Sequence, residues 1–568
     1  MATPITNMTV LQNKDRGQFK DQGANAQREI SQDHRVAWAL LVVLSLYLIS
    51  ALFGWPQYGT ELATSSHPAS TEVAANAEQD AERATPHSNA TKGQATQTHE
   101  NAEAHGARHD SIAAPPIWTV IPFVLLLAAI AVMPLISATE HWWENNLNRF
   151  KVALGLGLAT LAYFAFLHST PIEAHWPSHA VIQPSGSAME LGFVRTILGN
   201  ALLAEFIPFI VLLFSLYVIA GGIRIEGDLL ANPLTNASFI AAGGILASFI
   251  GTTGAAMLLI RPLLETNQER KHVKHTVVFF IFVVCNCGGC LLPIGDPPLF
   301  LGYLQGVDFL WTLKLFRPWL FINGLLLLTY CLLDQFVYFR KETVQDIERD
   351  IEQARGLKIS GLKVNGPLLL GVVLAVALLD PGKPIPGTHW HAWMYLREIV
   401  QLALVAISLL LGSEIVRRDN QFNYGAIIEV AALFTGIFIC MQPALQILGV
   451  KGAALSTHLD PAGFFWATGA LSSFLDNAPT YLVFFQTAKS GSMEGATLVA
   501  GVPEMILEAV SLGAVFMGAM TYIGNGPNFM VKAIAEKAGV KMPSFFGYMG
   551  YSVVFLLPLF ALTVWRYL

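Results

Sequence analysis

Two short blocks of polar and helix-breaking residues interrupt long apolar stretches of the chain. Residues 285–300 read CNCGGCLLPIGDPPLF, and residues 471–480 read LSSFLDNAPT. An ionisable side chain inside an apolar span costs several kcal/mol unless it is solvated or paired, so Asp296 and Asp476 are candidate functional residues. A carboxylate withdrawn from water holds a proton more readily, so it can bind H⁺ or Na⁺ in competition. The two aspartates therefore predict cation or proton exchange, with helix capping as the structural alternative.

Hydroxyl and amide side chains accompany these blocks. The residues expected to share an ion or substrate site with the aspartates are Ser248, Thr252, Thr253, Ser473, Asn477, Thr480 and Asn525. Their oxygen atoms suit a hard cation such as Na⁺, for which Asp476 and Asp296 are the expected charged ligands. Ser, Thr and Asn also cap helices, so an organising role at each position stays open.

Three glutamates near the starts of apolar runs are candidates for a proton relay. Glu508 lies one turn inside the run that leads to residues 518–529, whereas Glu205 and Glu429 open their runs. An acidic group at membrane depth marks a proton path by default. Glu205 and Glu429 also fit a position at an interface between helices.

The cysteine-rich segment 285–290 does not predict a metal or redox site. It lacks both a second cysteine pair and a histidine at ligand spacing. Small residues in apolar runs let helices pack closely, which is the simpler interpretation. We therefore expect no resident cofactor, and the ions bound would be the transported Na⁺ and H⁺.

The composition indicates what kind of protein must position these residues. Of 568 residues, 53% are hydrophobic and only 13% are charged, whereas soluble domains carry roughly a quarter charged residues. The sequence therefore predicts an all-α polytopic membrane protein whose main partner is the lipid bilayer. The net charge of −6 and the lack of a basic face give no indication of nucleic-acid binding.

Hydropathy predicts about eleven transmembrane helices and two re-entrant hairpins. The spans are expected near 36–55, 117–137, 149–168, 200–222, 276–304, 312–337, 366–380, 396–412, 426–449, 505–534 and 546–566. Small and polar residues interrupt two further apolar stretches, 236–262 and 462–487, which we interpret as the hairpins. The 276–304 span is too long for one helix, because about 1.5 Å per residue exceeds the ~30 Å hydrocarbon core. The prolines and Gly295 within 293–298 predict a break there, with Asp296 as N-cap of a second half-helix.

The two interrupted regions occur twice in the same order. LASFIGTTGA (246–255) matches LSSFLDNAPT (471–480), GGCLLPIGDPPLF (288–300) matches GAMTYIGNGPNF (518–529), and Glu205 matches Glu429. The matched positions 246 and 471, 296 and 525, and 205 and 429 lie 224 to 229 residues apart. An odd number of crossings separates the copies, so they are expected to be inverted repeats. Inverted repeats with broken helices are typical of secondary transporters.

The distribution of Lys and Arg orients this scheme. Basic connections near 138–151, 261–274, 339–363 and 413–420 all fall inside when the N-terminus is inside, which puts the C-terminus outside. The predicted segments are a cytoplasmic tail 1–35, an extra first transmembrane helix 36–55, a low-complexity outside loop 56–115, the repeats 116–338 and 365–568, and a charged cytoplasmic connector 339–364. The loop carries His87, His99, His105 and His109, for which a metal-binding tract is the alternative to a flexible loop. The expected location is a bacterial inner membrane.

PIGDPP (293–298), LDNAPT (475–480) and the duplication resemble the ion-transporter superfamily over roughly residues 117–567. That superfamily includes NhaD-type sodium:proton antiporters, arsenite exporters, and citrate and dicarboxylate transporters. The two blocks are most similar to the NhaD-type antiporters and to the citrate-transporter-like proteins grouped with them. The resemblance implies a scaffold, a moving part that holds both hairpins, and elevator-like alternating access. A homodimer is a further expectation that rests on the resemblance alone.

One departure from the superfamily bears on the substrate. Its carboxylate transporters carry a Ser-Asn-Thr signature at both hairpin tips, whereas here the tips read GTTG (251–254) and DNAPT (476–480). A carboxylate at Asp476 would repel an anionic substrate, and neither hairpin interior offers Arg or Lys in return. The prediction is therefore a sodium:proton antiporter, with a Na⁺- or H⁺-coupled citrate or dicarboxylate transporter as the alternative. A channel needs no opposed hairpins, and an enzyme should show a nucleophile and base or a metal cage, so we expect neither.

Overall fold

A computed structural model describes residues 32–65, 113–456, 459–491 and 495–568. The predicted tail up to residue 31 and the four histidines of the 56–115 loop lie outside the described residues. Within the described chain, helices dominate and only three short two-stranded ribbons occur. The predicted all-α polytopic class is confirmed at that level.

Six helices are long and apolar enough to cross a membrane in the part of the chain that is described. They are Gln32–Leu52, α7 (Asn146–Phe166), Leu191–Ala220, α10 (Pro233–Ile250), Trp311–Lys341 and α25 (Phe545–Tyr567). A seventh forms when α19 (Gly425–Cys440) and α20 (Gln442–Ser456), bent by 43° at their junction, are taken as one span. The other predicted spans are shorter or broken helices, so the number eleven stays a prediction.

Two of the long helices are composite. The Leu191–Ala220 helix consists of α8 (Leu191–Leu198), a π-helical segment Gly199–Phe206 and α9 (Ile207–Ala220). Trp311–Lys341 contains α14 (Phe316–Leu333) and a π-helical turn Asp334–Tyr338. The helices outside the hairpins, the broken helices and the connector include α2 (Trp55–Ser65), α5 (Ile121–Val132), α6 (Glu140–Trp143), α16 (Leu362–Leu378), α17 (Leu396–Leu411) and α18 (Glu414–Asp419).

Both predicted hairpin stretches are helix–break–helix units. In the first, α10 and α11 (Thr252–Thr266) meet at Gly251, whose φ of +78° favours glycine. In the second, α21 (Pro461–Ser472) is followed after a short turn by α22 (Asn477–Lys489). Because α10 meets the length and composition of a crossing by itself, re-entry of the first hairpin stays a prediction.

Two helices are broken where Gly and Pro predict it. The first runs from α12 (Lys274–Val283) through a 3₁₀ turn, Cys287–Cys290, to α13 (Pro297–Leu304). The second runs from α23 (Glu504–Met517) to α24 (Gly526–Lys537). Asp296 and Asn525 occupy the N-cap positions of α13 and α24, but neither side chain caps its helix. Asp296 is therefore at the predicted N-cap position, but the prediction that its side chain caps the helix is wrong.

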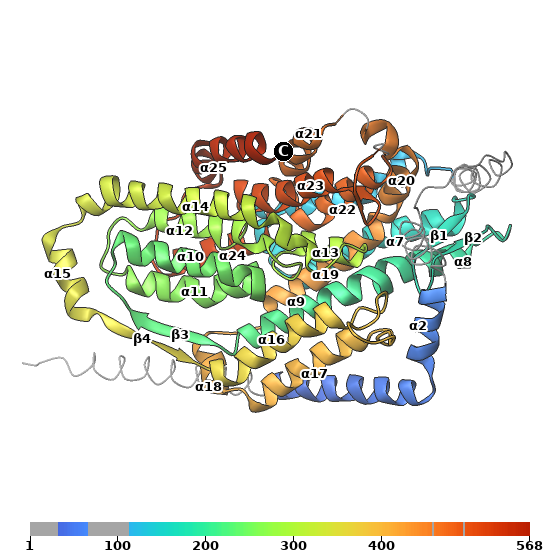
Figure 1. The fold of residues 1–568 in the computed structure, drawn as a ribbon, viewed down its shortest axis with the longest axis horizontal. Helices are drawn as coiled ribbons and strands as arrows, with labels where there is room; N and C mark the ends of the chain where they lie inside the picture. Colours follow the sequence, from blue (N-terminus) through green and yellow to red (C-terminus); the bar gives the residue numbers. More distant parts are fainter. Residues whose placement is uncertain (1–31, 66–112, 457–458, 492–494) are drawn as a thin grey trace, which may run out of the picture.

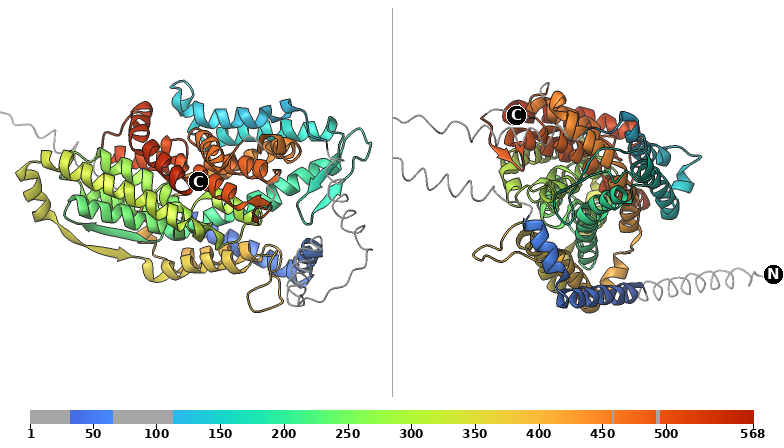
Figure 2. Two further views of the ribbon diagram at one scale, coloured as in Figure 1. Left: turned by 45° about the horizontal axis from the view of Figure 1, so that its top comes forward. Right: turned by 90° about the vertical axis from the view of Figure 1, so that its right-hand side faces the viewer.

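Each hairpin packs against the later half-helix of the other half of the chain. Helix α11 contacts α24, and α13 contacts α22. Figure 1 shows α10, α11, α12 and α24 in one group and α21, α22 and α23 in the next, with α16 and α17 below both. The helix Gln32–Leu52 (blue) lies at the edge of the molecule beside α17 (Figure 1 and Figure 2). Tyr47 Oη of this helix donates a hydrogen bond to the Met394 carbonyl over 3.0 Å.

Three ribbons cap the helical body. They are β1 (Ile172–Ala174) with β2 (Ala180–Ile182), β3 (Arg224–Asp228) with β4 (Arg355–Ser360), and β5 (Leu498–Val499) with β6 (Val502–Pro503), each antiparallel. The charged connector 339–364 is only partly helical, because α15 (Val344–Gln353) gives way to β4. The partner strand β3 lies about 130 positions earlier in the chain, so the local sequence around β4 does not predict this pairing.

The first residues of the segment predicted as an outside loop are helical. Residues 55–65 form α2, and the Thr60 hydroxyl accepts a hydrogen bond from the Met394 backbone N–H over 2.8 Å. This contact to a distant segment stabilises a short helix whose own sequence is only weakly helical.

Candidate functional site

The carboxylate of Asp296 lies at the junction of both hairpins and both broken helices. Asp296 is 1% exposed. Its Oδ1 accepts hydrogen bonds from Thr252 Oγ1 (2.9 Å) and Asn525 Nδ2 (3.1 Å), and its Oδ2 accepts one from Asn477 Nδ2 (2.6 Å). We call these four residues the junction cluster. The structure thus brings together four of the predicted site residues, one from each interrupted element.

Two further amides extend the junction cluster, and the sequence analysis did not single them out. Asn286 Nδ2 donates to Asn528 Oδ1 (2.8 Å), and Asn525 Nδ2 approaches Asn286 Oδ1 (3.3 Å) and donates to the Cys285 carbonyl (2.9 Å). Asn286 and Asn528 are fully buried. The sequence feature that could have identified them is an amide side chain within an apolar run, because a buried amide needs hydrogen-bond partners from another element.

The junction cluster contains no basic side chain. Among the described residues, no Arg, Lys or His forms an ion pair with Asp296, and its three side-chain donors are neutral. The Asn477 Oδ1 atom is buried without a hydrogen-bond partner. The positive ends of α13 and α24 offset part of the carboxylate's charge. A buried carboxylate beside an unsatisfied amide oxygen is suited to hold a proton or a small hard cation.

Asp476 lies outside the junction cluster's hydrogen bonds. Its Oδ1 accepts from the Ala478 backbone N–H (3.0 Å), which makes it the side-chain N-cap of α22. Thr480 Oγ1 donates to the Asp476 carbonyl over 3.0 Å. The observed contact of Asp476 therefore matches the capping interpretation, whereas Thr480 bonds back to the carbonyl four residues earlier. A direct role in ion binding stays a prediction for both.

The predicted hairpin serines fasten each hairpin to its own broken helix. Ser248 Oγ donates to the Gly288 carbonyl (2.6 Å), and Ser473 Oγ donates to the Met517 carbonyl (3.2 Å). The two donors lie 225 residues apart and the two acceptors 229 residues apart. The partly buried Thr253 has no hydrogen bond described for its side chain. Ser248 and Ser473 thus make corresponding contacts in the two halves.

The glutamates predicted for a proton relay do not contact the junction cluster. The span that contains Glu205 begins at Leu191 and not at residue 200, so Glu205 lies in its middle, within the π-helical segment. The buried Oε2 atom of Glu205 has no hydrogen-bond partner. Glu429 forms an ion pair with Arg149 (2.7 Å) and is partly exposed. Glu508 is partly buried one turn beyond Glu504, which pairs with Lys314. The relay role stays a prediction for all three.

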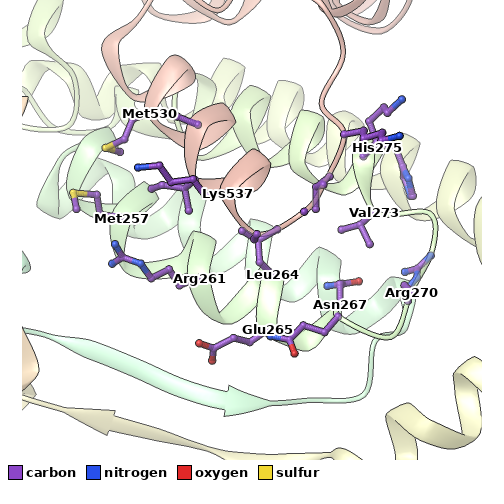
Figure 3. Close-up of a pocket in the computed structure, with 18 of the residues that line it drawn as sticks. Met257, Arg261, Leu264, Glu265, Asn267, Arg270, Val273, His275, Met530 and Lys537 are labelled. Carbon is purple, nitrogen blue, oxygen red and sulfur yellow. The ribbon is translucent and has the colours of Figure 1, made fainter. Parts of the chain in front are cut away.

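A basic cavity of about 1120 Å³ opens beside the first hairpin (Figure 3). Its walls come from α11, α24 and the connections 267–274 and 421–426. Among its lining residues, Glu265 is the single carboxylate. Four lining cations form no ion pair with a carboxylate in the described chain, namely Arg261, Lys274, Lys537 and Lys541. We call this space the basic cavity.

The chain matches a known protein family. A family model described as "Putative citrate transport" matches residues 112–568, which contain both hairpins and both broken helices. No curated protein matches the sequence significantly.

Proposed function

Given that the chain belongs to the family described as "Putative citrate transport" and is therefore a secondary transporter of the membrane, we propose that it exchanges Na⁺ for H⁺ at Asp296. The observation that carries this proposal is the isolated charge of the junction cluster. Asp296 is buried, receives only neutral donors and has beside it the unpartnered Oδ1 of Asn477. An ion or a proton is the missing partner of such a group.

The exchange follows from competition for one carboxylate. In one state Asp296 carries a proton and the junction cluster is neutral. In the other the proton has left, and Na⁺ binds the Asp296 carboxylate together with the Asn477 amide oxygen. The junction cluster is close to neutral when it carries either H⁺ or Na⁺. The occupied cluster can therefore change its access from one side of the membrane to the other more easily than the empty, charged cluster.

We further propose that the two halves are inverted repeats and that access alternates by an elevator-like movement. The corresponding contacts of Ser248 and Ser473 support the repeat. The packing of α11 on α24 and of α13 on α22 supports joint movement of both hairpins. The basic connections favour an inner membrane with the N-terminus inside. Asp476 would organise the second hairpin in this arrangement.

A second candidate is a Na⁺- or H⁺-coupled citrate or dicarboxylate transporter. The family description and the basic cavity favour it, because four unpaired cations attract a multivalent anion. A cation bound at Asp296 would offset the charge that otherwise repels such a substrate. In this candidate Asp296 couples transport to the cation, and the anion enters through the basic cavity.

Energised everted vesicles from a host without its own antiporters separate the two candidates. A fluorescent dye follows the acid gradient while Na⁺ and then citrate are added. Collapse of the gradient by Na⁺ alone, absent in Asp296→Asn, supports the antiporter. If Na⁺ alone leaves the gradient intact and labelled citrate moves only with Na⁺ or H⁺, the citrate transporter replaces it.

A further inference from the structure

Three carboxylates far from the junction cluster share a small volume beside the connector. They are Asp228 at the end of β3, Glu269 in the connection after α11, and Asp350 on α15. One oxygen atom of each lies within 4.8 Å of the others. We call this group the connector carboxylates, and neither the sequence analysis nor the proposed function gives it a role.

Each connector carboxylate presents an unsatisfied oxygen. Asp228 Oδ1, Glu269 Oε2 and Asp350 Oδ1 are buried, and none has a hydrogen-bond partner. Asp350 is only 7% exposed, and its other oxygen accepts from the Ala231 backbone N–H over 2.9 Å. That second contact holds the carboxylate in place and leaves Oδ1 without a partner. Three like charges at this spacing repel one another unless a positive charge lies between them.

The nearby basic residues do not supply that charge. Arg355 faces Asp228 across the β3–β4 ribbon, yet in the described chain no Arg, Lys or His lies within ion-pair distance of any connector carboxylate. The Arg270 guanidinium is bound to Asp334 through two hydrogen bonds of 3.0 and 2.5 Å. The ligand that fits is therefore a cation from outside the chain.

We propose that the connector carboxylates bind a hard divalent cation, Ca²⁺ in preference to Mg²⁺. The donors are all oxygens, which suit Ca²⁺ or Mg²⁺ rather than the softer metals that prefer nitrogen and sulfur. Ca²⁺ accepts irregular geometry and several carboxylates, whereas Mg²⁺ demands near-octahedral geometry and usually keeps its water ligands, so three carboxylates from three separate segments suit Ca²⁺ better. All three oxygens lie within 4.8 Å of one another, so one ion can contact them all.

The position of this site gives it a regulatory consequence. Glu269 stands between Gln268 and Arg270, which both line the basic cavity, and Figure 3 shows this connection at the cavity's edge above the β3–β4 ribbon. Asp350 belongs to the connector between the two halves. A bound cation fastens the connector to the rim of the basic cavity and restricts the movement of that rim. This inference does not depend on which substrate the protein transports.

Binding is tested on the purified full chain in detergent after treatment with a chelator. Calorimetry with CaCl₂ and MgCl₂ is expected to show one saturable Ca²⁺ site per chain and weaker Mg²⁺ binding, and Ca²⁺ should raise the unfolding temperature. Asp350→Asn is expected to lower the Ca²⁺ affinity roughly tenfold or more, because affinity follows the number of charged ligands. The asparagine keeps an oxygen that can accept from Ala231.

Two variants make the result decisive. Glu352→Gln removes an exposed carboxylate from the same helix α15 and should leave Ca²⁺ binding unchanged. Glu269→Gln removes a ligand from a loop, so it gives the same test if Asp350→Asn does not fold. The proposal is overturned if the wild type binds no Ca²⁺ up to about 1 mM, the weak end of protein sites. It is equally overturned if all variants bind alike, or if only acidification stabilises the protein, which would indicate a proton shared among the carboxylates.

Discussion

Asn525 Nδ2 donates a hydrogen bond to Asp296 Oδ1 over 3.1 Å, between corresponding positions of the two broken helices. Both residues stand at the N-cap of a half-helix, and neither caps its own backbone. The side chains are therefore available to each other and to the hairpin tips. A movement that separates the two broken helices would remove a donor from the Asp296 carboxylate.

The two aspartates should differ sharply in function. Asp296→Asn removes the buried charge and is expected to abolish Na⁺-dependent proton exchange. Asp476→Asn should retain most of it, because asparagine is as good an N-cap as aspartate. Asp476→Ala should retain exchange but destabilise the start of α22 by about 1 kcal/mol, seen as a lower unfolding temperature. If Na⁺-dependent proton exchange survives Asp296→Asn but disappears in Asp476→Asn, the ion binds at Asp476 in the second hairpin and not at Asp296.

Asn477 should determine the apparent affinity for Na⁺. Asn477→Ala removes the shortest donor to Asp296 and the unpartnered amide oxygen. Hydrogen bonds to charged groups contribute about 1.5–3 kcal/mol, so the half-maximal Na⁺ concentration should rise about tenfold or more. Dye quenching at a series of Na⁺ concentrations measures it. As a control, Asn420→Ala removes two hydrogen bonds to the Gly221 and Ile223 carbonyls and should leave this concentration unchanged.

Glycine is required at both helix breaks for the same steric reason. A Cβ on Gly295 would clash with the Gly289 carbonyl oxygen, and one on Gly524 would stand 2.6 Å from the Gly518 carbonyl oxygen. Gly295→Ala and Gly524→Ala should each destabilise the protein by about 1–3 kcal/mol. Gly526→Ala meets no atom within 4 Å and is the matched control. Thermal unfolding in detergent compares the three, and equal unfolding temperatures would refute the close approach at the breaks.

The charge of the basic cavity should affect an anion and not a cation. Arg261→Gln combined with Lys537→Gln removes two of its unpaired cations. We expect an unchanged apparent Na⁺ affinity in proton exchange and, if citrate is carried, a several-fold weaker citrate affinity that depends less on salt. Lys532→Gln, whose side chain pairs with Glu536 over 3.1 Å outside the cavity, serves as the control. A changed Na⁺ affinity in the double variant would place the cation path through this cavity.

The sequence by itself determined where the helices break. The prolines and Gly295 within 293–298 cannot continue a helix, and the matching Gly524-Asn525-Gly526-Pro527 block acts in the same way. These constraints act on the backbone of the residues that carry them, so no distant partner is needed to predict them. The apolar composition of the intervening runs determined the membrane class for an equally direct reason.

The tertiary structure decided what each polar side chain does. Asp296 receives its donors from Thr252, Asn477 and Asn525, which lie 44, 181 and 229 positions away. Asp476 instead accepts a hydrogen bond from the backbone N–H of Ala478, two residues along the chain. Its residue type alone indicated the same chemistry as that of Asp296. The pairing of β3 with β4 likewise joins segments more than a hundred residues apart, and the connector carboxylates come from three separate segments at positions 228, 269 and 350. Residue type limits the chemistry a side chain can perform, but burial and partners depend on contacts that only the folded chain brings together.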